Sequence, residues 1–163
     1  MGKADKGSAR NRLAGAAYEE EIVRDINRLE LFVEVGRSST LNKDLDRKKL
    51  DIIPVDADLF DEFIYRIQAK STTKLVPYPK LLKDLKDNFD GIPVVFHKKT
   101  VRVAPERYLT EGRYAIMDEK DFLSIVADLE RYKSGYDVLS QYWDSISDEE
   151  QPIAHKQLNK LGL

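Results

Sequence analysis

The segments KLDIIPV at residues 49–55 and EFIYRIQAK at residues 62–70 decide the fold. Both are rich in the β-branched and aromatic residues that favour strands, and a short acidic stretch beginning at Asp56 lies between them, as is typical of a turn. Two adjacent strands with a short connector predict an antiparallel pair. Because Pro54 has no N–H to donate, the first strand is expected to lie at a sheet edge or to end there.

Helices and further strands are expected on both sides of this pair. Upstream, apolar periodicity predicts a helix from about Asn11 to Phe32, while the opening arm looks loosely ordered and the polar stretch 36–49 is interpreted as a loop. Downstream we expect a helix over 80–89, a buried strand over 92–97, strands over 99–104 and 112–117, and a helix over about 118–132. Two short helices should follow Ser134, the last one capped by Ser147.

This order predicts an α/β domain with a mixed central sheet flanked by helices. Residues 1–10 form a basic flexible arm, residues 11–133 the core, and residues 134–163 a C-terminal helical extension of the same domain. A chain of 163 residues with 42% apolar and 34% charged residues suits one domain with an ordinary core.

The composition excludes several kinds of site. Without cysteine there is no disulfide framework, no zinc–thiolate cluster and no thiol nucleophile. No apolar run approaches the roughly 18 residues of a membrane span, so we expect a soluble, cytoplasmic protein without membrane contact. A net charge of −2 does not exclude a nucleic-acid partner, because phosphate contact depends on where the cations lie.

One glutamate of the first predicted helix lies on its apolar face. At about 100° per residue, Glu19 falls inside the arc that contains Ile22, whereas Glu20 and Glu21 fall outside it. Glu30 also falls inside, but close to the helix end, where its side chain reaches solvent more easily. Burying an unpaired carboxylate costs several kcal/mol, so Glu19 should have a partner: a cation such as an arginine, a hydrogen-bond network or a metal ion.

Polar side chains also recur on the two central strands. Strand alternation places Asp51 on one face with Ile53, and Gln68 on one face with Lys70. If the two strands are neighbours, a carboxylate, an amide carbonyl and an ammonium group converge on one side of the sheet. The alternative is that these are solvent-exposed strand positions, as most isolated Asp and Lys residues in strands are.

The ordered set Glu19, Asp51 and Gln68-Ala69-Lys70 resembles the PD-(D/E)XK nuclease superfamily, which has a helix glutamate, a strand aspartate and an E-x-K or Q-x-K on the next strand. The flanking segments are similar to a phage-type branch of Holliday-junction resolvases: GAAYEE, KLDIIPVD, YRIQAKSTT, YPKLLKDL, GIPVVFHKKT and GRYAIMDEKDF. Leu50 stands at the motif's nominal proline. Gln68 replaces the usual acid, which removes one negative charge but keeps a carbonyl oxygen.

The resemblance implies a restriction-endonuclease-like fold and a metal-dependent DNA endonuclease, acting as a homodimer on four-way junctions in a host cytoplasm. It implies that Glu19, Asp51 and Gln68 hold Mg²⁺ or Mn²⁺, hard ions that prefer oxygen ligands. Lys70 then orients the attacking water or stabilises the charged transition state. Two alternatives stay open: another nuclease of the superfamily, of repair or Mrr-like type, and a non-catalytic DNA-binding accessory protein of the same fold.

Basic residues gather in three segments that are candidates for phosphate contact, although charge runs are commonly just solvated faces. The candidates are Lys3, Lys6, Arg10, Arg12, Arg37, Lys43, Arg47, Lys48, Lys49, Lys98, Lys99 and Arg102. Other features are interpreted without a function: the acidic turn after Asp56 lacks the spacing of a calcium loop, and neither His97 nor His155 has a partner that suggests a catalytic triad. Trp143 is expected to pack rather than to stack on bases.

Overall fold

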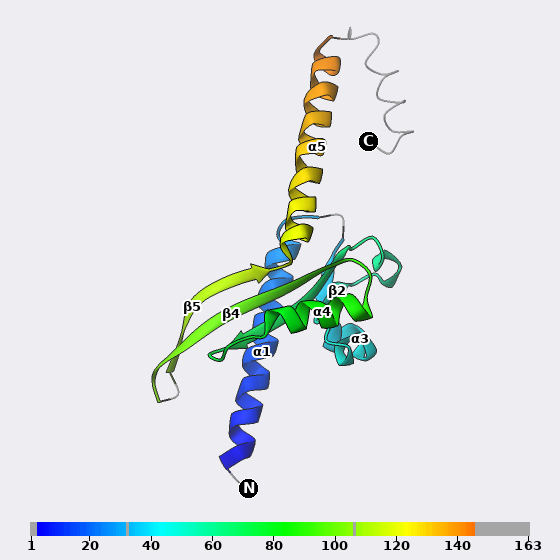
Figure 1. Cartoon of the computed structure of the whole chain (residues 1–163). Coiled ribbons are helices and arrows are strands. Elements are labelled where there is room, and N and C mark those ends of the chain that lie inside the picture. Colours follow the sequence, from blue (N-terminus) through cyan, green and yellow to red (C-terminus); the bar gives the residue numbers. More distant parts are fainter. Residues whose placement is uncertain (1–2, 32, 106, 146–163) are drawn as a thin grey trace. The chain divides into compact units, whose positions relative to one another are not determined.

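The computed structural model describes residues 3–31, 33–105 and 107–145 and divides the chain into two units, Met1–Asp118 and Glu119–Leu163. The first unit is built on a mixed five-stranded sheet in the order β1-β2-β3-β4-β5 (Figure 1). The bounds are β1 Val35–Arg37, β2 Ile52–Pro54, β3 Tyr65–Thr72, β4 Ile92–Ala104 and β5 Arg107–Ile116. The predicted α/β class with a mixed sheet is therefore confirmed.

The antiparallel pairing of the two central strands is also confirmed, although it is short. β2 pairs with β1 over its whole length, with Gly36 opposite Ile53, but meets β3 only at Ile52 and Ile67. β3 and β4 run parallel over eight residue pairs, from Tyr65 opposite Ile92 onwards. β3 therefore continues beyond β2 and leaves part of its edge without a strand partner.

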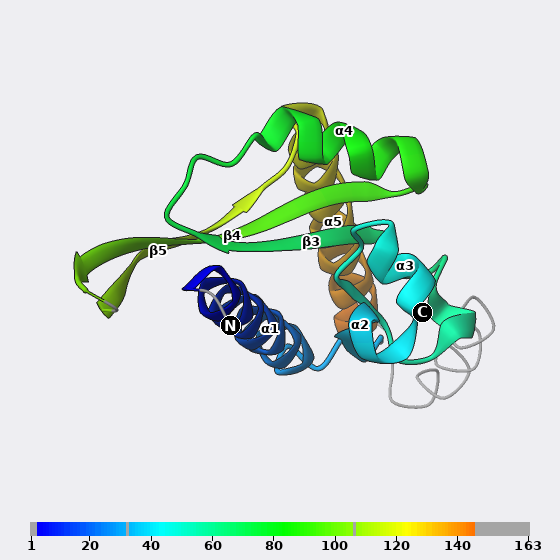
Figure 2. The same ribbon diagram turned by 90° about the horizontal axis from the view of Figure 1, so that it is seen from below.

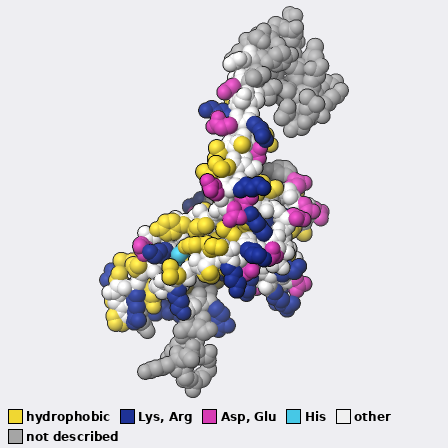
Figure 3. Space-filling view, viewed as in Figure 1, with side chains coloured by type: hydrophobic (Ala, Val, Ile, Leu, Met, Phe, Trp, Pro, Cys, Tyr) yellow, Lys and Arg dark blue, Asp and Glu magenta, His cyan; other side chains and the backbone are white. Residues whose placement is uncertain are grey.

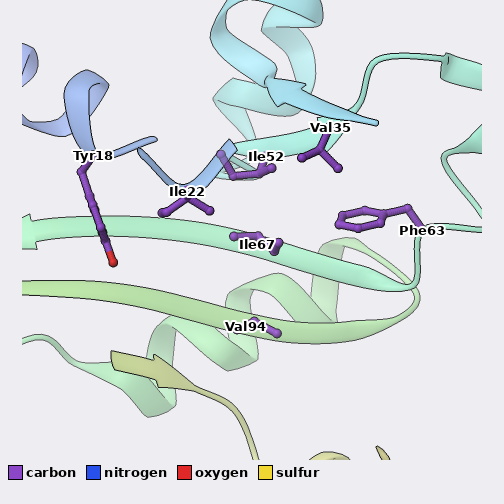
Figure 4. Packing of buried hydrophobic residues seen from close by; sticks show 7 residues of the cluster. All are labelled: Tyr18, Ile22, Val35, Ile52, Phe63, Ile67 and Val94. Carbon is purple, nitrogen blue, oxygen red and sulfur yellow. The ribbon is translucent and has the colours of Figure 1, made fainter. Parts of the chain in front are cut away.

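Two helices cover opposite faces of this sheet: α1, Lys3–Asn27, and α4, Tyr78–Asn88 (Figure 2). The α1 face is sealed by one apolar cluster, in which Tyr18 and Ile22 of α1 point toward the strands (Figure 4). Its buried members are Tyr18, Ile22, Val35, Ile52, Phe63, Ile67 and Val94. A second cluster of Leu50, Ile53 and Leu85 packs under α4. Burial of such side chains from both faces gives the sheet its central place in the fold.

The ends of the first helix differ from the prediction. α1 begins at Lys3 rather than near Asn11, so the basic arm continues the helix instead of forming a loose segment. It ends at Asn27 because the Asn27 side chain exchanges two hydrogen bonds of 2.9 Å with the Val35 backbone, which turns the chain into β1. Glu30 then lies beyond the helix, exposed and with a positive φ of 51°.

The polar stretch interpreted as a loop contains three short elements: β1, α2 at Ser38–Leu41 and α3 at Lys43–Arg47. Asn42 separates the two helices, and its side chain accepts hydrogen bonds from the N–H groups of Asp44 and Leu45. This is an N-cap, which supplies partners to the first orphan donors of a helix. A single helical turn buries too few apolar residues to produce a periodic pattern, so periodicity alone could not reveal it.

Two further predicted breaks are absent from the described residues. The predicted strands 92–97 and 99–104 are one strand, β4, which bends through register shifts against β5 near Lys99 and Arg102. α5, at Glu119–Ser145, is one helix where the sequence predicted a break near Ser134. Gly135 lies inside it; a glycine costs a helix only about 1 kcal/mol, which does not end it. The predicted cap at Ser147 lies outside the described residues.

Candidate active site

Asp51 lies at the point where β2 leaves β3. Its N–H donates to the Ile67 carbonyl at 2.9 Å, and its carboxylate oxygen Oδ2 accepts the Ala69 N–H at 2.7 Å. The local register is irregular, because Leu50 and Ile53 belong to the cluster under α4 whereas Ile52 belongs to the cluster under α1. The Asp51 carboxylate thus occupies the β3 edge in place of a strand, between the two faces of the sheet.

The electrostatic state of Asp51 is unusual for an aspartate. Burial raises the pKa of the Asp51 carboxyl to about 6. The Ala69 N–H and the Lys70 ammonium oppose this rise, while the negative charges of Glu19 and Asp46 add to it. Perturbed carboxyl pKa values of this kind concentrate at functional sites, where a charged group is held against its own desolvation.

Glu19 projects from α1 and is held by an arginine. Arg37 donates through Nε to Glu19 Oε2 at 2.8 Å and through Nη1 to Glu20 Oε1 at 3.1 Å. Only 19% of the Glu19 side chain is exposed, against 62% for Glu20, so the helical wheel chose the more buried of the two acids. Burial lowers the pKa of the Arg37 guanidinium, but the hydrogen bonds with both glutamates outweigh it and the pKa is raised. Of the three kinds of partner considered for Glu19, the structure shows the first, an arginine.

Gln68 and Lys70 come from β3 itself. Ile67 and Ala69 face the cluster under α1, so alternation directs Gln68 and Lys70 toward the α4 face. Gln68 is 2% exposed, and Lys70 is half-buried. The structure therefore does not place all the predicted groups on one side of the sheet: Glu19 belongs to the α1 face, Gln68 and Lys70 to the other.

Asp51 is the residue that joins these groups. It is within electrostatic reach of both Glu19 and Lys70, because it sits at the open edge where the two faces meet. Among the described residues, no hydrogen bond reaches Glu19 Oε1 or Asp51 Oδ1, so each carboxylate keeps one oxygen for another ligand. The same part of the chain holds no group of three His, Cys, Asp or Glu residues arranged for a metal ion. The predicted set has two acids and one amide.

A histidine that the sequence gave no reason to choose lies next to Lys70. His97 is the direct β4 neighbour of Lys70 in the parallel register and is 3% exposed. Its Nδ1 shares a 2.5 Å hydrogen bond with the Tyr78 hydroxyl of α4, whereas its Nε2 has no hydrogen-bond partner among the described residues. The parallel β3–β4 register was the missing information, because it pairs residues 27 positions apart in the sequence.

A second polar cluster, also not anticipated, ties α1 to β4 and β5. Lys98 Nζ donates to both Glu21 oxygens, at 2.8 and 2.9 Å, and Arg113 donates to Glu21 and, at 3.2 Å, to Asp25. Burial raises the pKa of Glu21, but the hydrogen bonds with Lys98 and Arg113 outweigh it and the pKa is lowered. Both cations also lie near the Tyr18 ring, whose hydroxyl pKa burial raises to about 12. The acidic and basic groups of this cluster pair with one another, so we interpret the cluster as a structural link between α1 and the strands.

Basic and acidic side chains are interspersed on the visible face of the first unit (Figure 3). The predicted phosphate-contacting cations divide into those that form ion pairs and those that are exposed. Four are held in ion pairs: Arg37 with Glu19 and Glu20, Arg47 with Asp44, Lys98 with Glu21, and Lys99 with Glu111. Others are exposed: Arg12, Lys43, Lys48, Lys49 and Arg102. Arg10 lies 5.2 Å from the centre of the Tyr108 ring. Lys3 and Lys6 open α1, and their side chains lie outside the described residues.

Comparisons with known proteins identify no relative of this chain, so any function has to be argued from its own residues. No family model, no curated protein and no solved structure matches the chain. None of the helices in the described ranges is long and apolar enough to cross a membrane.

Proposed function

We propose that the protein is a Mg²⁺- or Mn²⁺-dependent DNA endonuclease with a restriction-endonuclease-like core, acting as a homodimeric Holliday-junction resolvase. The observation that carries the proposal is the Asp51 carboxyl, whose pKa is raised to about 6 at an open strand edge, within electrostatic reach of Glu19 and Lys70. A carboxylate kept partly desolvated and without a salt bridge is costly in structural terms. A hard cation bound there would offset that cost.

The proposal takes Asp51 and Glu19 as the main donors, because Gln68 is 2% exposed and directed toward the other face of the sheet. Asp51 Oδ1 and Glu19 Oε1 are the two carboxylate oxygens without a hydrogen-bond partner among the described residues, and Gln68 offers an amide oxygen. Magnesium needs only one or two carboxylates because it keeps several of its waters. When bound, the ion would neutralise charge on a phosphate oxygen and lower the pKa of a water molecule.

The protein's own groups then have separate tasks. The Ala69 N–H fixes Asp51 through Oδ2, so that the other oxygen keeps one orientation. The Lys70 ammonium group, next to the Asp51 carboxylate, would orient the attacking water and stabilise the charge that develops on the phosphate. Arg37 holds Glu19 through Oε2, so a bound ion would have to share that carboxylate with Arg37 or displace it.

DNA is the substrate that the exposed cations suit. Lys43, Lys48 and Lys49 follow one another around α3, on the chain segment that leads directly into Asp51. Contacts from such residues go to phosphates, position the duplex and carry no base sequence. Symmetric cutting of a four-way junction requires two active sites related by a two-fold axis, and hence a homodimer.

A junction-cleavage assay tests the proposal. With Mg²⁺ or Mn²⁺, the purified chain should nick a synthetic four-way junction at symmetric positions and spare a linear duplex of the same sequence. Equal cutting of both substrates would instead indicate a general nuclease of repair or Mrr-like type. Asp51→Asn is the matched inactive variant, because an asparagine oxygen can still accept the Ala69 N–H.

Two observations favour a second candidate, a DNA-binding accessory protein without cleavage activity. Glu19 Oε2 is already paired with Arg37, and Gln68 is almost fully buried. Junction binding without metal-dependent cleavage, unchanged by Asp51→Asn, would support this candidate over the nuclease.

A further inference from the structure

The helix α5 carries a continuous apolar seam. Seven of its large apolar residues recur at alternating steps of three and four positions along the sequence, beginning at Phe122, while Leu123 and Val126 lie beside this row. The α5 seam consists of Phe122, Ile125, Leu129, Tyr132, Tyr136, Leu139 and Trp143. This is the a/d pattern of a coiled coil, sustained over three heptads. A period of 3.5 residues, rather than 3.6, is the repeat that keeps a seam facing a second helix over this length.

Four of the seam's described side chains are open to solvent in the single chain, and Ile125 is half-buried. The exposed fractions are 53% for Phe122, 62% for Leu129, 78% for Tyr132 and 72% for Tyr136. Scattered exposed apolar residues need no explanation, but an aligned row of aromatic and aliphatic side chains marks an interaction surface.

We propose that the α5 seam binds the α5 seam of a second copy of this chain as a parallel two-stranded coiled coil. A second copy of α5 matches the seam, because two identical helices repeat their apolar residues with the same period and register. The surface is also extensive. Among the described side chains of the seam, Phe122, Tyr132 and Tyr136 are aromatic and more than half exposed, and an aromatic side chain buries about 150–250 Å² when fully covered. Together with Leu129 they supply a substantial part of the about 800 Å² per partner of a standard interface.

Charges beside the seam favour the parallel orientation. With Phe122 at position a, Asp128 occupies position g and Lys133 the following position e. In a parallel dimer each g residue faces the e residue of the next heptad on the other helix, so Asp128 meets the partner subunit's Lys133, twice by symmetry. In the single chain Asp128 is paired with Arg131 of its own helix at 3.0 Å, but both side chains are more than half exposed, so the partner subunit's Lys133 can compete for or share that carboxylate.

The full chain and two matched pairs of variants test the pairing. At micromolar concentrations, sedimentation equilibrium should give twice the chain mass of 18.8 kDa. Leu129→Asp should raise the dissociation constant at least about tenfold, whereas Ser134→Asp, on the opposite side of the helix, should leave the dimer intact. Tyr136→Lys and its control Gln141→Lys provide the same comparison with the other charge, in case one aspartate variant fails to fold.

Orientation has its own test, since the chain contains no cysteine. Phe122→Cys places one thiol at the start of the seam, where it meets its counterpart only in a parallel pair; mild oxidation with copper phenanthroline should give a covalent dimer. Asp128→Lys and Lys133→Asp should each weaken the dimer, and the double variant should restore it. A monomeric full chain, or a dimer unaffected by Leu129→Asp, overturns the proposal. The readout is mass, so its failure is distinguishable from absence of nuclease activity.

Discussion

The Asp51 carboxylate accepts the Ala69 N–H at 2.7 Å and so completes a strand edge that β2 leaves open. In most sheets a backbone carbonyl fills that role. Here a side chain does, and it is one that loses solvation in doing so, which raises its pKa to about 6. Asp51, a candidate site residue, therefore also lowers the stability of the fold at neutral pH.

Asp51→Asn should stabilise the metal-free protein above pH 7. The folded-state pKa of about 6 lies above the reference value of 3.8, so between these values the folded state binds more protons than the unfolded state. The free energy of unfolding then falls as pH rises through that window. Asparagine does not titrate, so the variant does not lose this stability. Relative to the wild-type protein, its free energy of unfolding should be higher by at most about 3 kcal/mol at pH 7 to 8, and this difference should vanish near pH 4. Urea unfolding measured across pH checks the sign, with Asp84→Asn, exposed on α4, as the control.

The same substitution should abolish metal-dependent cleavage while junction binding persists, because it removes a charge from the proposed ligand set but not a phosphate-contacting cation. Glu19→Gln should also reduce cleavage strongly, by about 10²-fold or more. Glu20→Gln and Glu30→Gln should have much smaller effects. If Glu20→Gln proved the more damaging, Glu19 would not be the helix ligand.

Arg37 should stabilise the fold and compete with a cation for Glu19. Replacing it by Gln removes the hydrogen bonds at 2.8 and 3.1 Å that join α1 to the end of β1, so the free energy of unfolding should fall by about 1–3 kcal/mol. Mn²⁺ should then bind more tightly to the variant than to the wild-type protein, as measured by calorimetry. Arg113→Gln, which breaks ion pairs away from Glu19, is the control and should leave Mn²⁺ affinity unchanged.

The exposed cations around α3 should govern the salt dependence of DNA binding. Each lost phosphate contact reduces the slope of log K against log salt by about 0.9. Lys43→Ala with Lys49→Ala should therefore reduce it by up to about two units of slope. Lys83→Ala provides the control, since Lys83 lies on α4 and is paired with Asp87 at 2.6 Å. Equal slopes for all three proteins would place the DNA surface elsewhere.

The sequence predicted the strand pair and the main helices because their apolar residues repeat with the period of the element. The helical wheel also placed Glu19, and not Glu20, on the more buried side of α1, although it placed Glu30 inside the apolar arc as well. What it missed depends on contacts between distant residues. Local periodicity contained no sign that Arg37 reaches Glu19 or that His97 lies beside Lys70. Alternation failed at Asp51, where an irregular register separates its neighbours between two cores.

The hydrogen bond between Tyr78 and His97 should contribute measurably to the α4 face. His97 is 3% exposed, and the 2.5 Å contact with the Tyr78 hydroxyl is its only side-chain hydrogen bond among the described residues. Tyr78→Phe removes the hydroxyl while keeping the ring beside the histidine, so it leaves both imidazole nitrogens buried without partners. An unsatisfied buried polar atom costs about 1–3 kcal/mol. Thermal unfolding should show that loss for Tyr78→Phe and almost none for Tyr108→Phe, whose side chain is 46% exposed. Because Lys70 is the strand neighbour of His97, cleavage by Tyr78→Phe should fall together with stability if the histidine also holds the lysine in place.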